Sequence, residues 1–282
     1  MITKRFYILF IFVVLLAGVS GATAQQEPKI TSDYSALIEE TLPSWDESVL
    51  KAPAQKIWTD RVSMKSVEEA VRDKIPTRSE KETYQDKDRK LKIDKDKGYI
   101  RYINSNRDYK HGVSPAKAVD RSEAEKMILG ALTTIGLPRD EMRIVIVSTV
   151  IGQGGSTREK IHDEKTMREQ MVYINRQINN LPVYASEVKG AVSNSDEIAR
   201  LLIKWPDFLM ADVKKLRTRN DVTRDIVQQI ENQTKGMPVS VNMNLAYTPL
   251  SYEGRIRFVP GIVVTVRPAE GNGFAFTVPV SE

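Results

Sequence analysis

The residue types that carry most enzyme chemistry are scarce in this sequence. It has no cysteine, which excludes a thiol nucleophile, an iron–sulfur site, a cysteine zinc site and a disulfide. Its two histidines are His111, which precedes Gly112, and His162, within Lys-Ile-His-Asp-Glu. Neither belongs to the H-E-x-x-H motif of zinc peptidases, and no G-x-S-x-G nucleophile motif occurs. We expect both histidines to be solvated loop residues.

Paired carboxylates are the remaining route to acid–base chemistry, because the chain holds 37 aspartates and glutamates. None stands in a distinctive motif. Asp163-Glu164 lies in a polar stretch, and Glu123 and Glu125 open a predicted helix, so we interpret both pairs as solvated or capping residues. The sequence therefore predicts no catalytic, cofactor-binding or metal-binding residue, and no cofactor.

Tyrosines offer a different kind of site. Five of them fall in segments with strand periodicity, namely Tyr99, Tyr102, Tyr173, Tyr184 and Tyr247. They could line a ligand groove, although aromatic residues at strand spacing more often pack in a core or across strands. Both interpretations stay open at the level of sequence.

The N-terminus predicts export. Lys4 and Arg5 precede an unbroken apolar run over 6–17, which is too short for a membrane span of about 20 residues. Ala22-Thr23-Ala24 then supplies the small-x-small pattern of a signal-peptidase site, with cleavage before Gln25. We predict a signal peptide over 1–24, and an uncleaved anchor is the alternative.

Cleavage changes the size and charge of the chain only slightly. Removal of 24 residues from 282 leaves 258, and the loss of Lys4 and Arg5 lowers the formal charge from +5 to +3. So small an excess gives no basis for binding nucleic acid or an anionic membrane. We therefore expect a secreted or periplasmic protein without stable membrane insertion, and the absence of disulfides favours a bacterial source.

Residues 25–113 form a predicted N-terminal segment. Ser66-Val67-Glu68-Glu69 has the spacing of a capping box with Ser66 as N-cap, and it predicts a helix over 66–74. Strand-like alternation on both sides of Gly98 predicts a solvated β-hairpin over 90–104.

A clearer pattern follows in residues 114–207. Apolar residues at helical spacing begin after Asp120, and Gly136-Leu137-Pro138 ends that helix. Segments of strand periodicity come next, at 143–151, 171–178, 183–192 and 198–205. In the last segment one face is apolar, which describes a sheet covered on one side only. The residues on that face are Ala199, Leu201, Ile203 and Trp205.

The order recurs in residues 208–282. A helix is predicted after Asp221 and ends at Gly236-Met237-Pro238, which matches the earlier Gly-x-Pro. Alternating strands follow from Val239, interrupted at Pro260-Gly261, where we predict a bulge or a sheet edge. Both units therefore place one helix before an antiparallel meander.

These patterns predict an α+β fold of tandem units, each a helix packed on a curled antiparallel meander. The predicted parts are the signal peptide (1–24), the N-terminal segment (25–113), the first unit (114–207) and the second unit (208–282). The repeat depends on element order and one short motif, so chance similarity is the alternative.

The turn between two of these strands carries a family resemblance. The segment Tyr-Ile-Asn-Arg-Gln-Ile-Asn-Asn-Leu-Pro-Val-Tyr-Ala over 173–185 resembles the strand–turn–strand motif of PepSY and FTP domains, the propeptide-like modules of thermolysin-type and fungalysin-type metallopeptidases. Asn180 stands where the family usually has the turn glycine, and Ala185 replaces a later glycine. The resemblance covers about residues 115–206, and it assigns Asn180, Leu181, Pro182 and Val183 to the family's turn and strand.

The resemblance implies a cystatin-like arrangement of a helix on a curled sheet, and a role as a folding aid or inhibitor of a peptidase. No peptidase domain is recognised in this sequence, so such an action would be in trans. We therefore expect an exported, non-enzymatic protein that binds a protein partner, with a peptidase as the first candidate. The contact would use a sheet face, an edge strand or the glycine-containing loop 152–167.

Two other functions stay open. One is an exported enzyme that acts on peptide or cell-wall material through an unidentified carboxylate pair. The other is a structural or small-molecule-binding envelope protein whose groove the tyrosines would line. Hydrolysis that is abolished by a carboxylate-to-amide change would favour the enzyme, and ligand-dependent thermal stabilisation would favour the binding protein.

Overall fold

The computed structural model describes most of the chain. It places residues 29–51, 57–75, 79–80, 83–108, 119–152, 155–156, 161–162, 166–252 and 255–282. The predicted signal peptide, with Ala22, Ala24 and Gln25, lies outside the described residues, so cleavage stays a prediction. Within the described part, no helix is both long enough and apolar enough to cross a membrane.

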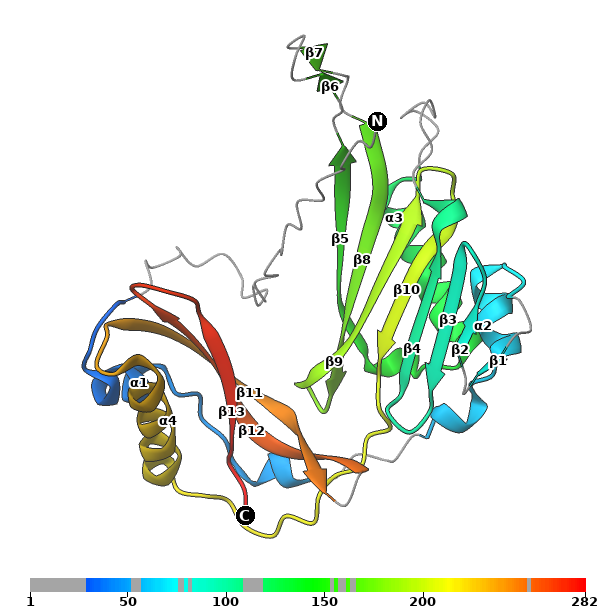
Figure 1. Cartoon of the computed structure of the whole chain (residues 1–282). Helices are drawn as coiled ribbons and strands as arrows, with labels where there is room; N and C mark the ends of the chain where they lie inside the picture. The colour runs from blue at the N-terminus through cyan, green and yellow to red at the C-terminus, as the bar shows by residue number, and fades with distance from the viewer. Residues whose placement is uncertain are drawn as a thin grey trace.

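The described chain is built mostly of strands. The α-helices are α1 (Tyr34–Thr41), α2 (Met64–Val71), α3 (Arg121–Ile135) and α4 (Arg219–Thr234), and the 3₁₀ helices are η1 (Glu47–Leu50), η2 (Thr59–Arg61), η3 (Ser105–Arg107) and η5 (Arg139–Glu141). The strands are β1 (Ser79–Glu80), β2 (Thr83–Gln85), β3 (Arg89–Asp94), β4 (Tyr99–Asn104), β5 (Met142–Gly152), β6 (Gly155–Ser156), β7 (Ile161–His162), β8 (Thr166–Ile178), β9 (Leu181–Ser193), β10 (Ile198–Lys204), β11 (Val239–Tyr252), β12 (Arg255–Pro268) and β13 (Phe274–Pro279). The prediction of a mixed fold of helices and largely antiparallel strands is confirmed at this level (Figure 1).

Strands β1 to β4, β5, and β8 to β10 form one antiparallel sheet, here called the first sheet, and β6 and β7 pair separately as a two-stranded sheet. The order of the first sheet is β1-β2-β3-β4-β10-β9-β8-β5. The predicted hairpin is β3 and β4, and β4 extends the sheet because Ile103 pairs with Arg200 of β10. Gly98 turns the hairpin at φ +55°, and a Cβ there would stand 2.3 Å from the Trp205 carbonyl oxygen. Glycine therefore lets the hairpin tip lie against the end of β10.

The C-terminal strands form the second sheet, in the antiparallel order β11-β12-β13. It meets the first sheet where β9 and β11 pair in parallel, at Val183 and Tyr247. The two sheets diverge from this joint, as Figure 1 shows. In strand order they make one sheet of 11 strands, but each has its own core.

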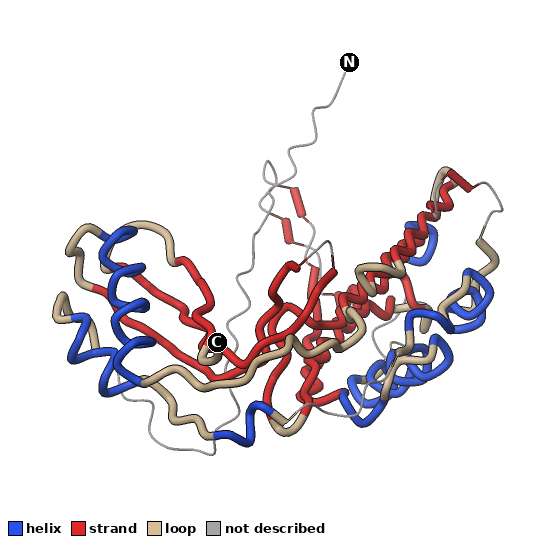
Figure 2. Tube along the Cα trace, turned by 90° about the horizontal axis from the view of Figure 1, so that it is seen from below, coloured by secondary structure: helices blue, strands red, loops and turns tan. Residues whose placement is uncertain are grey.

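Helices cover one face of each sheet. α2 and α3 pack on the first sheet, in a core that includes Val67, Ile128, Leu132 and Leu201. α1 and α4 pack on the second, in a core that includes Leu37, Ile38, Ile226 and Val264. Seen from below, the α-helices lie toward the two ends of the molecule, with most strands between them (Figure 2). The apolar face predicted for β10 is confirmed, because Ala199, Leu201, Ile203 and Trp205 are all fully buried.

Residues predicted as one N-terminal segment contribute to both cores. α1 belongs with α4, because the Tyr34 hydroxyl donates to the Met237 carbonyl at 2.6 Å and lies 2.9 Å from the Thr234 hydroxyl. Thr31 forms an antiparallel bridge with Val239 at the start of β11. α2 and the β3–β4 hairpin belong instead to the first core. The segment therefore spans both halves of the molecule.

Two predicted helix starts are wrong by about one turn. α2 begins after Ser63, whose hydroxyl oxygen accepts from the Ser66 N–H at 3.1 Å, while the Ser66 hydroxyl accepts from the Ser63 N–H at 3.0 Å. Ser66 is thus the third residue of the helix, at the far end of the box, and not its N-cap. α4 begins after Thr218, which accepts from the Asp221 N–H at 3.2 Å. The predicted N-cap of α3, Asp120, is confirmed.

The two Gly-x-Pro motifs follow their helices in different ways. Gly136 is itself the C-cap of α3, with φ +100°, and its N–H donates to the carbonyls of Leu132 and Thr133. α4 is capped by Lys235 at φ +51°, and Gly236 follows at φ +86°. A lysine is strained in the left-handed region where a glycine is not, so the end of α4 is the less favourable one.

The predicted bulge at Pro260-Gly261 is wrong, because β12 runs through both residues and pairs with β11 without a shift in register, whereas the alternative of a sheet edge agrees with the end of β13 at this point. β13 ends where Pro260 lies. The Pro260 carbonyl accepts from the Val280 N–H at 3.0 Å, and the Val280 carbonyl accepts from the Arg217 N–H at 2.9 Å. Arg217 thus replaces the N–H that proline lacks. Gly261 avoids a clash, since a Cβ there would stand 2.8 Å from Thr248 Oγ1.

Candidate functional site

The motif that carries the family resemblance lies at the joint between the two sheets. Asn179 and Asn180 have φ of 50° and 63°, so the predicted tight turn is confirmed. Pro182 then pairs opposite Gln177, and Val183 packs in a small third core at the joint. The other residues in or against that core include Ile178, Leu181, Phe208, Tyr247 and Phe258. Residues 180–183 therefore help to hold the two sheets together.

Immediately after this motif β9 bulges. Glu187 lies opposite Asn175 of β8, but Pro182 lies opposite Gln177, so residues 183–186 of β9 face a single residue of β8. Ala185 in this bulge has φ +60°. A side chain in the left-handed region costs about 1–2 kcal/mol, and glycine is the residue that the resemblance leads us to expect here. Strain of this kind persists where the surroundings fix it, and it clusters at binding sites.

Arg176 fills the inner side of the bulge. Its side chain is fully buried, and its Nε donates to Glu141 Oε2 at 2.7 Å while Nη1 donates to the Pro206 carbonyl at 2.5 Å. The guanidinium lies 5.1 Å from the centre of the Trp205 ring and 5.7 Å from that of Phe208. Burial lowers the pKa of the Arg176 guanidinium, and Glu141 opposes that shift. Sequence reasoning missed this pair, although strand alternation places Arg176 on the buried face of β8.

A groove of about 360 Å³ opens on the outer side of the bulge. It lies between the β3–β4 hairpin, the bulge of β9, the end of β10 and the ends of β11 and β12 that face the joint. The hairpin and β10 contribute charged side chains, which are Lys92, Asp94, Lys97 and Lys204. The second sheet and the chain after β10 contribute apolar ones, which are Pro206, Pro249, Ile256 and Phe258.

The acidic groups near the groove are already engaged. Asp94 accepts from the Lys97 N–H at 3.1 Å and lies 3.5 Å from Lys97 Nζ, so it serves the hairpin turn. Glu187 is shared between two lysines, with Lys189 Nζ at 3.0 Å and Lys204 Nζ at 3.6 Å. One carboxylate therefore neutralises two ammonium groups only in part.

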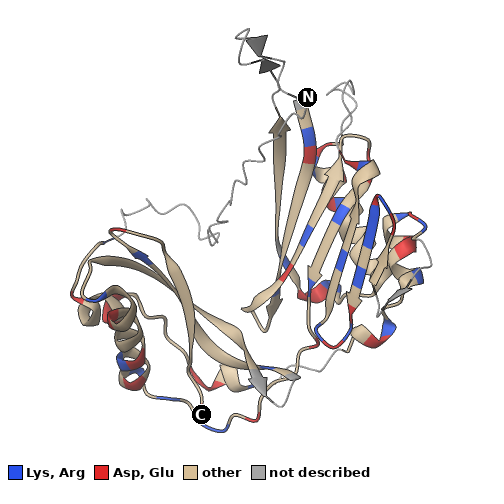
Figure 3. Cartoon of the chain, viewed as in Figure 1, with Lys and Arg blue, Asp and Glu red and all other residues tan. Residues whose placement is uncertain are grey.

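The groove continues into the face of the first sheet that carries no helix, here called the helix-free face. One row of side chains across it consists of Lys92, Arg101, Leu202, Lys189, Tyr173 and Ile146. The neighbouring row consists of Lys90, Ile103, Arg200, Ala191, Met171 and Ser148. Figure 3 shows how Lys and Arg recur along β3, β4, β9 and β10. The face thus mixes cationic and apolar side chains with a few carboxylates, of which Glu169 pairs with Arg200 and Glu187 with Lys189 and Lys204.

The tyrosines that the sequence singled out separate into three environments. Tyr99 and Tyr184 line the groove, and Tyr173 lies on the helix-free face. Tyr102 and Tyr247 are buried in the cores. Because Tyr99 and Tyr102 are an odd number of residues apart on β4, they point to opposite faces of the sheet. The structure therefore brings only part of the proposed set together.

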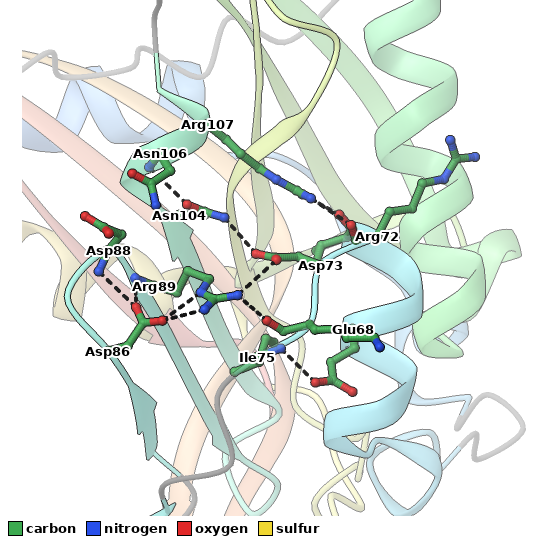
Figure 4. Close-up of polar contacts among 12 residues, drawn as sticks. Glu68, Arg72, Asp73, Ile75, Asp86, Asp88, Arg89, Asn104, Asn106 and Arg107 are labelled. Carbon is green, nitrogen blue, oxygen red and sulfur yellow. Dashed lines mark hydrogen bonds and ion pairs between the residues drawn. The ribbon is translucent and has the colours of Figure 1, made fainter.

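A polar cluster lies on the covered side of the hairpin, between the end of α2 and β3–β4 (Figure 4). Asp73 accepts from the Tyr102 hydroxyl and from the Asn104 amide, each at 2.7 Å, and Arg89 lies 3.5 Å from it. Arg89 also donates to Asp86 at 2.8 Å and lowers the pKa of that carboxyl by this hydrogen bond. Burial raises the pKa of the Tyr102 phenol. Both carboxylates are bound by one arginine, so the cluster holds α2 against the hairpin.

The histidines, carboxylate pairs and loop named in the sequence analysis form no site among the described residues. His111 and Asp163-Glu164 lie outside the described residues. Of the predicted loop 152–167, Gly152 ends β5 and Thr166 and Met167 begin β8. The prediction of His162 as a loop residue is wrong, because it lies in β7 and pairs with Gly155 of β6. Glu123 is exposed at the start of α3. Within the described ranges, no group of three or more histidine and carboxylate side chains could hold a metal ion.

Comparison with known proteins finds no neighbour, because no family model, no curated protein and no solved structure matches the chain. The resemblance to PepSY and FTP domains therefore depends on the residues alone. The groove and the helix-free face are the features of the described chain that bear on function.

Proposed function

We propose that this chain is an exported, non-enzymatic interaction protein that binds a protein partner through the helix-free face of its first sheet. The observation that carries the proposal is the chemistry of that face. Helices bury one side of the sheet, while the other keeps cationic, aromatic and aliphatic side chains and leads into the groove. Mixed polar and aromatic surfaces next to a concavity are typical of binding sites.

We further propose that the two halves are tandem propeptide-like units of the cystatin-like kind. Support comes from the order of elements, in which each longer helix precedes an antiparallel meander. α3 packs against β5, β8 and β9, and α4 packs against β12 and β13. A proline follows two residues after the glycine in both connections, at Pro138 and Pro238.

A peptidase is the first class of partner to test. The resemblance implies that modules of this kind inhibit or assist the folding of a peptidase, and this chain would then act in trans. The helix-free face supports such a contact, because it offers charged and aromatic side chains that helices leave uncovered.

The experiment is a capture with the mature chain, residues 25–282, immobilised and exposed to the exported fraction of its source cells. We expect a specific protein to be retained, and a heat-unfolded chain serves as the control. Retention of no specific protein would overturn the interaction function. In parallel, the chain is added to a thermolysin-type metallopeptidase, and unchanged hydrolysis of a peptide substrate would remove that class of partner.

A further inference from the structure

Two kinds of surface meet in the groove at the joint. Lys92 and Lys204 present ammonium groups on one side, while Pro249 and Ile256 of the second sheet line the other, with Phe258 behind them. An occupant that satisfies both sides needs an anionic group next to a large apolar group. Charge complementarity then selects the occupant more sharply than buried area does.

We propose that the groove binds an extended acidic segment of the partner protein, in which carboxylate side chains alternate with large apolar ones. This inference deepens the proposed function and rests on it. In an extended peptide, successive side chains point to opposite sides. A carboxylate can therefore lie between Lys92 and Lys204 while the next side chain lies against Ile256.

The free charge of the groove supports an anionic occupant. Lys92 has its ammonium 5.9 Å from the centre of the Tyr99 ring, and no carboxylate lies within ion-pair distance of it among the described residues. Lys204 pairs with Glu187, but that carboxylate also pairs with Lys189. Farther along the helix-free face, Arg101 is exposed and likewise has no ion-pair partner in the described part of the chain.

The bulge supports an extended, main-chain mode of binding. Tyr184, Ala185 and Ser186 line the groove, and none of them has an opposite residue in the registers with β8, β10 or β11. Ser186 is 3% exposed, and its hydroxyl has no hydrogen-bond partner among the described residues. Peptides that join a sheet use main-chain groups of this kind for affinity and side-chain pockets for specificity. The strained backbone of Ala185 keeps this stretch out of the ladder of β8.

A polyanion and a membrane suit the groove less well. Nucleic acid and anionic polysaccharide offer nothing to the apolar wall, and a formal charge of +5 on 282 residues is small for a binder of polyanions. A lipid surface requires an exposed convex or flat apolar patch, whereas this site is concave. Both become outcomes of the test.

The probe is the synthetic peptide acetyl-Glu-Phe-Glu-Phe-Glu-amide, titrated into the ¹⁵N-labelled mature chain and followed by ¹H–¹⁵N spectra. We expect saturable shifts of the amide signals of Tyr184, Ala185 and Ser186. Peptides with Gln for Glu or Ala for Phe should bind at least ten-fold more weakly. Absence of saturable shifts, or equal affinity for the Gln peptide, would overturn the proposal.

The matched variants are Lys92→Gln with Lys204→Gln in the groove, and Lys65→Gln with Lys126→Gln on the exposed sides of α2 and α3. Both doubles remove the same charge, and thermal melts establish that both are folded. We expect the groove variant to lose at least ten-fold in peptide affinity and the control variant to keep it. Equal loss in both variants, or equal competition by a single-stranded oligonucleotide or by vesicles of anionic lipid, would show general charge attraction and overturn the proposal.

The capture experiment separates this inference from the proposed function. If the wild-type chain and the groove variant retain the same protein equally, the interaction function stands and the groove proposal fails. If the wild-type chain retains no specific protein while the acidic peptide still binds in the groove, the interaction function fails and the ligand chemistry of the groove stands.

Discussion

The two sheets each bury one face under helices, but their helix-free faces carry different chemistry. On the second sheet, the central cross-strand rows consist of small and neutral side chains, such as Asn242, Thr265 and Ala275, or Asn244, Val263 and Thr277. Arg267 and Arg257 lie on the same face, toward the two ends of β12. On the first sheet, the matching rows contain lysine, arginine, tyrosine and branched aliphatic residues. The charged and aromatic surface of the first sheet therefore marks where binding chemistry is concentrated.

The interiors of the described chain also differ, because buried charge is found at the first sheet and not in the second core. Among the described residues, the only charged side chains that count as buried are Glu141 and Arg176, and both belong to the first sheet where it meets the joint. The second core is built mainly from aliphatic side chains with Tyr34, and the buried hydroxyl of Thr234 is partnered by Tyr34 and by the Ile230 carbonyl. The first sheet thus depends on an ion pair for its shape at the groove, and the second depends on apolar burial.

The largest expected effect comes from removing one partner of the buried ion pair, which tests whether the first sheet depends on that pair. Glu141→Gln leaves the buried Arg176 charge without a counter-ion, so we expect the free energy of unfolding to fall by about 3–5 kcal/mol. Urea unfolding measures the change. The variant Glu270→Gln, at an exposed turn, should stay within about 0.5 kcal/mol of the wild type. A loss at Glu141 no larger than at Glu270 would show that the pair does not hold the bulge.

The helix ends provide a pair of changes with opposite signs. Gly136→Ala puts a side chain at φ +100° and should lower the free energy of unfolding by about 1–2 kcal/mol. Lys235→Gly relieves φ +51° at the end of α4 and should raise it by up to about 1 kcal/mol. Thermal unfolding of the two variants gives both signs. Shifts of the same sign would mean that the two helix ends are not strained as described.

The smallest effect is a dependence on pH that both halves share. Arg89 lowers the pKa of Asp86 in the first half, and the hydrogen bond from Thr218 lowers the pKa of Asp221 in the second. A carboxyl whose pKa is depressed by folding stabilises above its unfolded pKa of about 3.9, and this contribution is lost as the pH falls through the folded pKa. Asp86→Asn and Asp221→Asn should therefore each lower stability at pH 7 and flatten its decline below pH 4.

Unfolding curves between pH 7 and pH 2.5 test this expectation, with Asp212→Asn at an exposed position as the control. If a variant stays as sensitive to acid as the wild type, the carboxyl it lacks does not contribute to the pH dependence of stability. If only the Asp86→Asn variant loses acid sensitivity, that sensitivity comes from the first half alone, and the two halves differ in this respect as well.

Local patterns predicted those features that depend on a few neighbouring residues. Alternation defined the buried face of β10, Gly98 marked the hairpin, and Asn179-Asn180 marked the turn. The two helix starts failed for a local reason, because another capping residue, Ser63 or Thr218, lies about one turn before the predicted start. Other features depend on residues distant in sequence. Pro260 continues a strand because Arg217 supplies the missing donor, and no local rule contains that information.

The groove was beyond the reach of sequence patterns for the same reason. Its walls come from the β3–β4 hairpin, the bulge of β9, the end of β10 and the joint-facing ends of β11 and β12, which are brought together by the topology of the two sheets. The tyrosines were the available signal, and they identified Tyr99 and Tyr184 correctly as lining residues. The strand period would have excluded Tyr102 from the set of groove residues, because it lies three positions after Tyr99 and side chains an odd number of positions apart in a strand point to opposite faces.

The pairing of α1 with α4 determines the order in which the chain can acquire its structure during synthesis. The hydroxyls of Tyr34 and Thr234 lie 2.9 Å apart, although 200 positions separate them in the chain. Residues 58–205 supply the whole first core, so it can form while the C-terminus is still being translated. α1 emerges from the ribosome among the first elements and gains its partner last, after closure of a long loop whose entropic cost slows folding. Leu37 and Ile38 stay exposed on the nascent chain until α4 and β12 arrive to cover them.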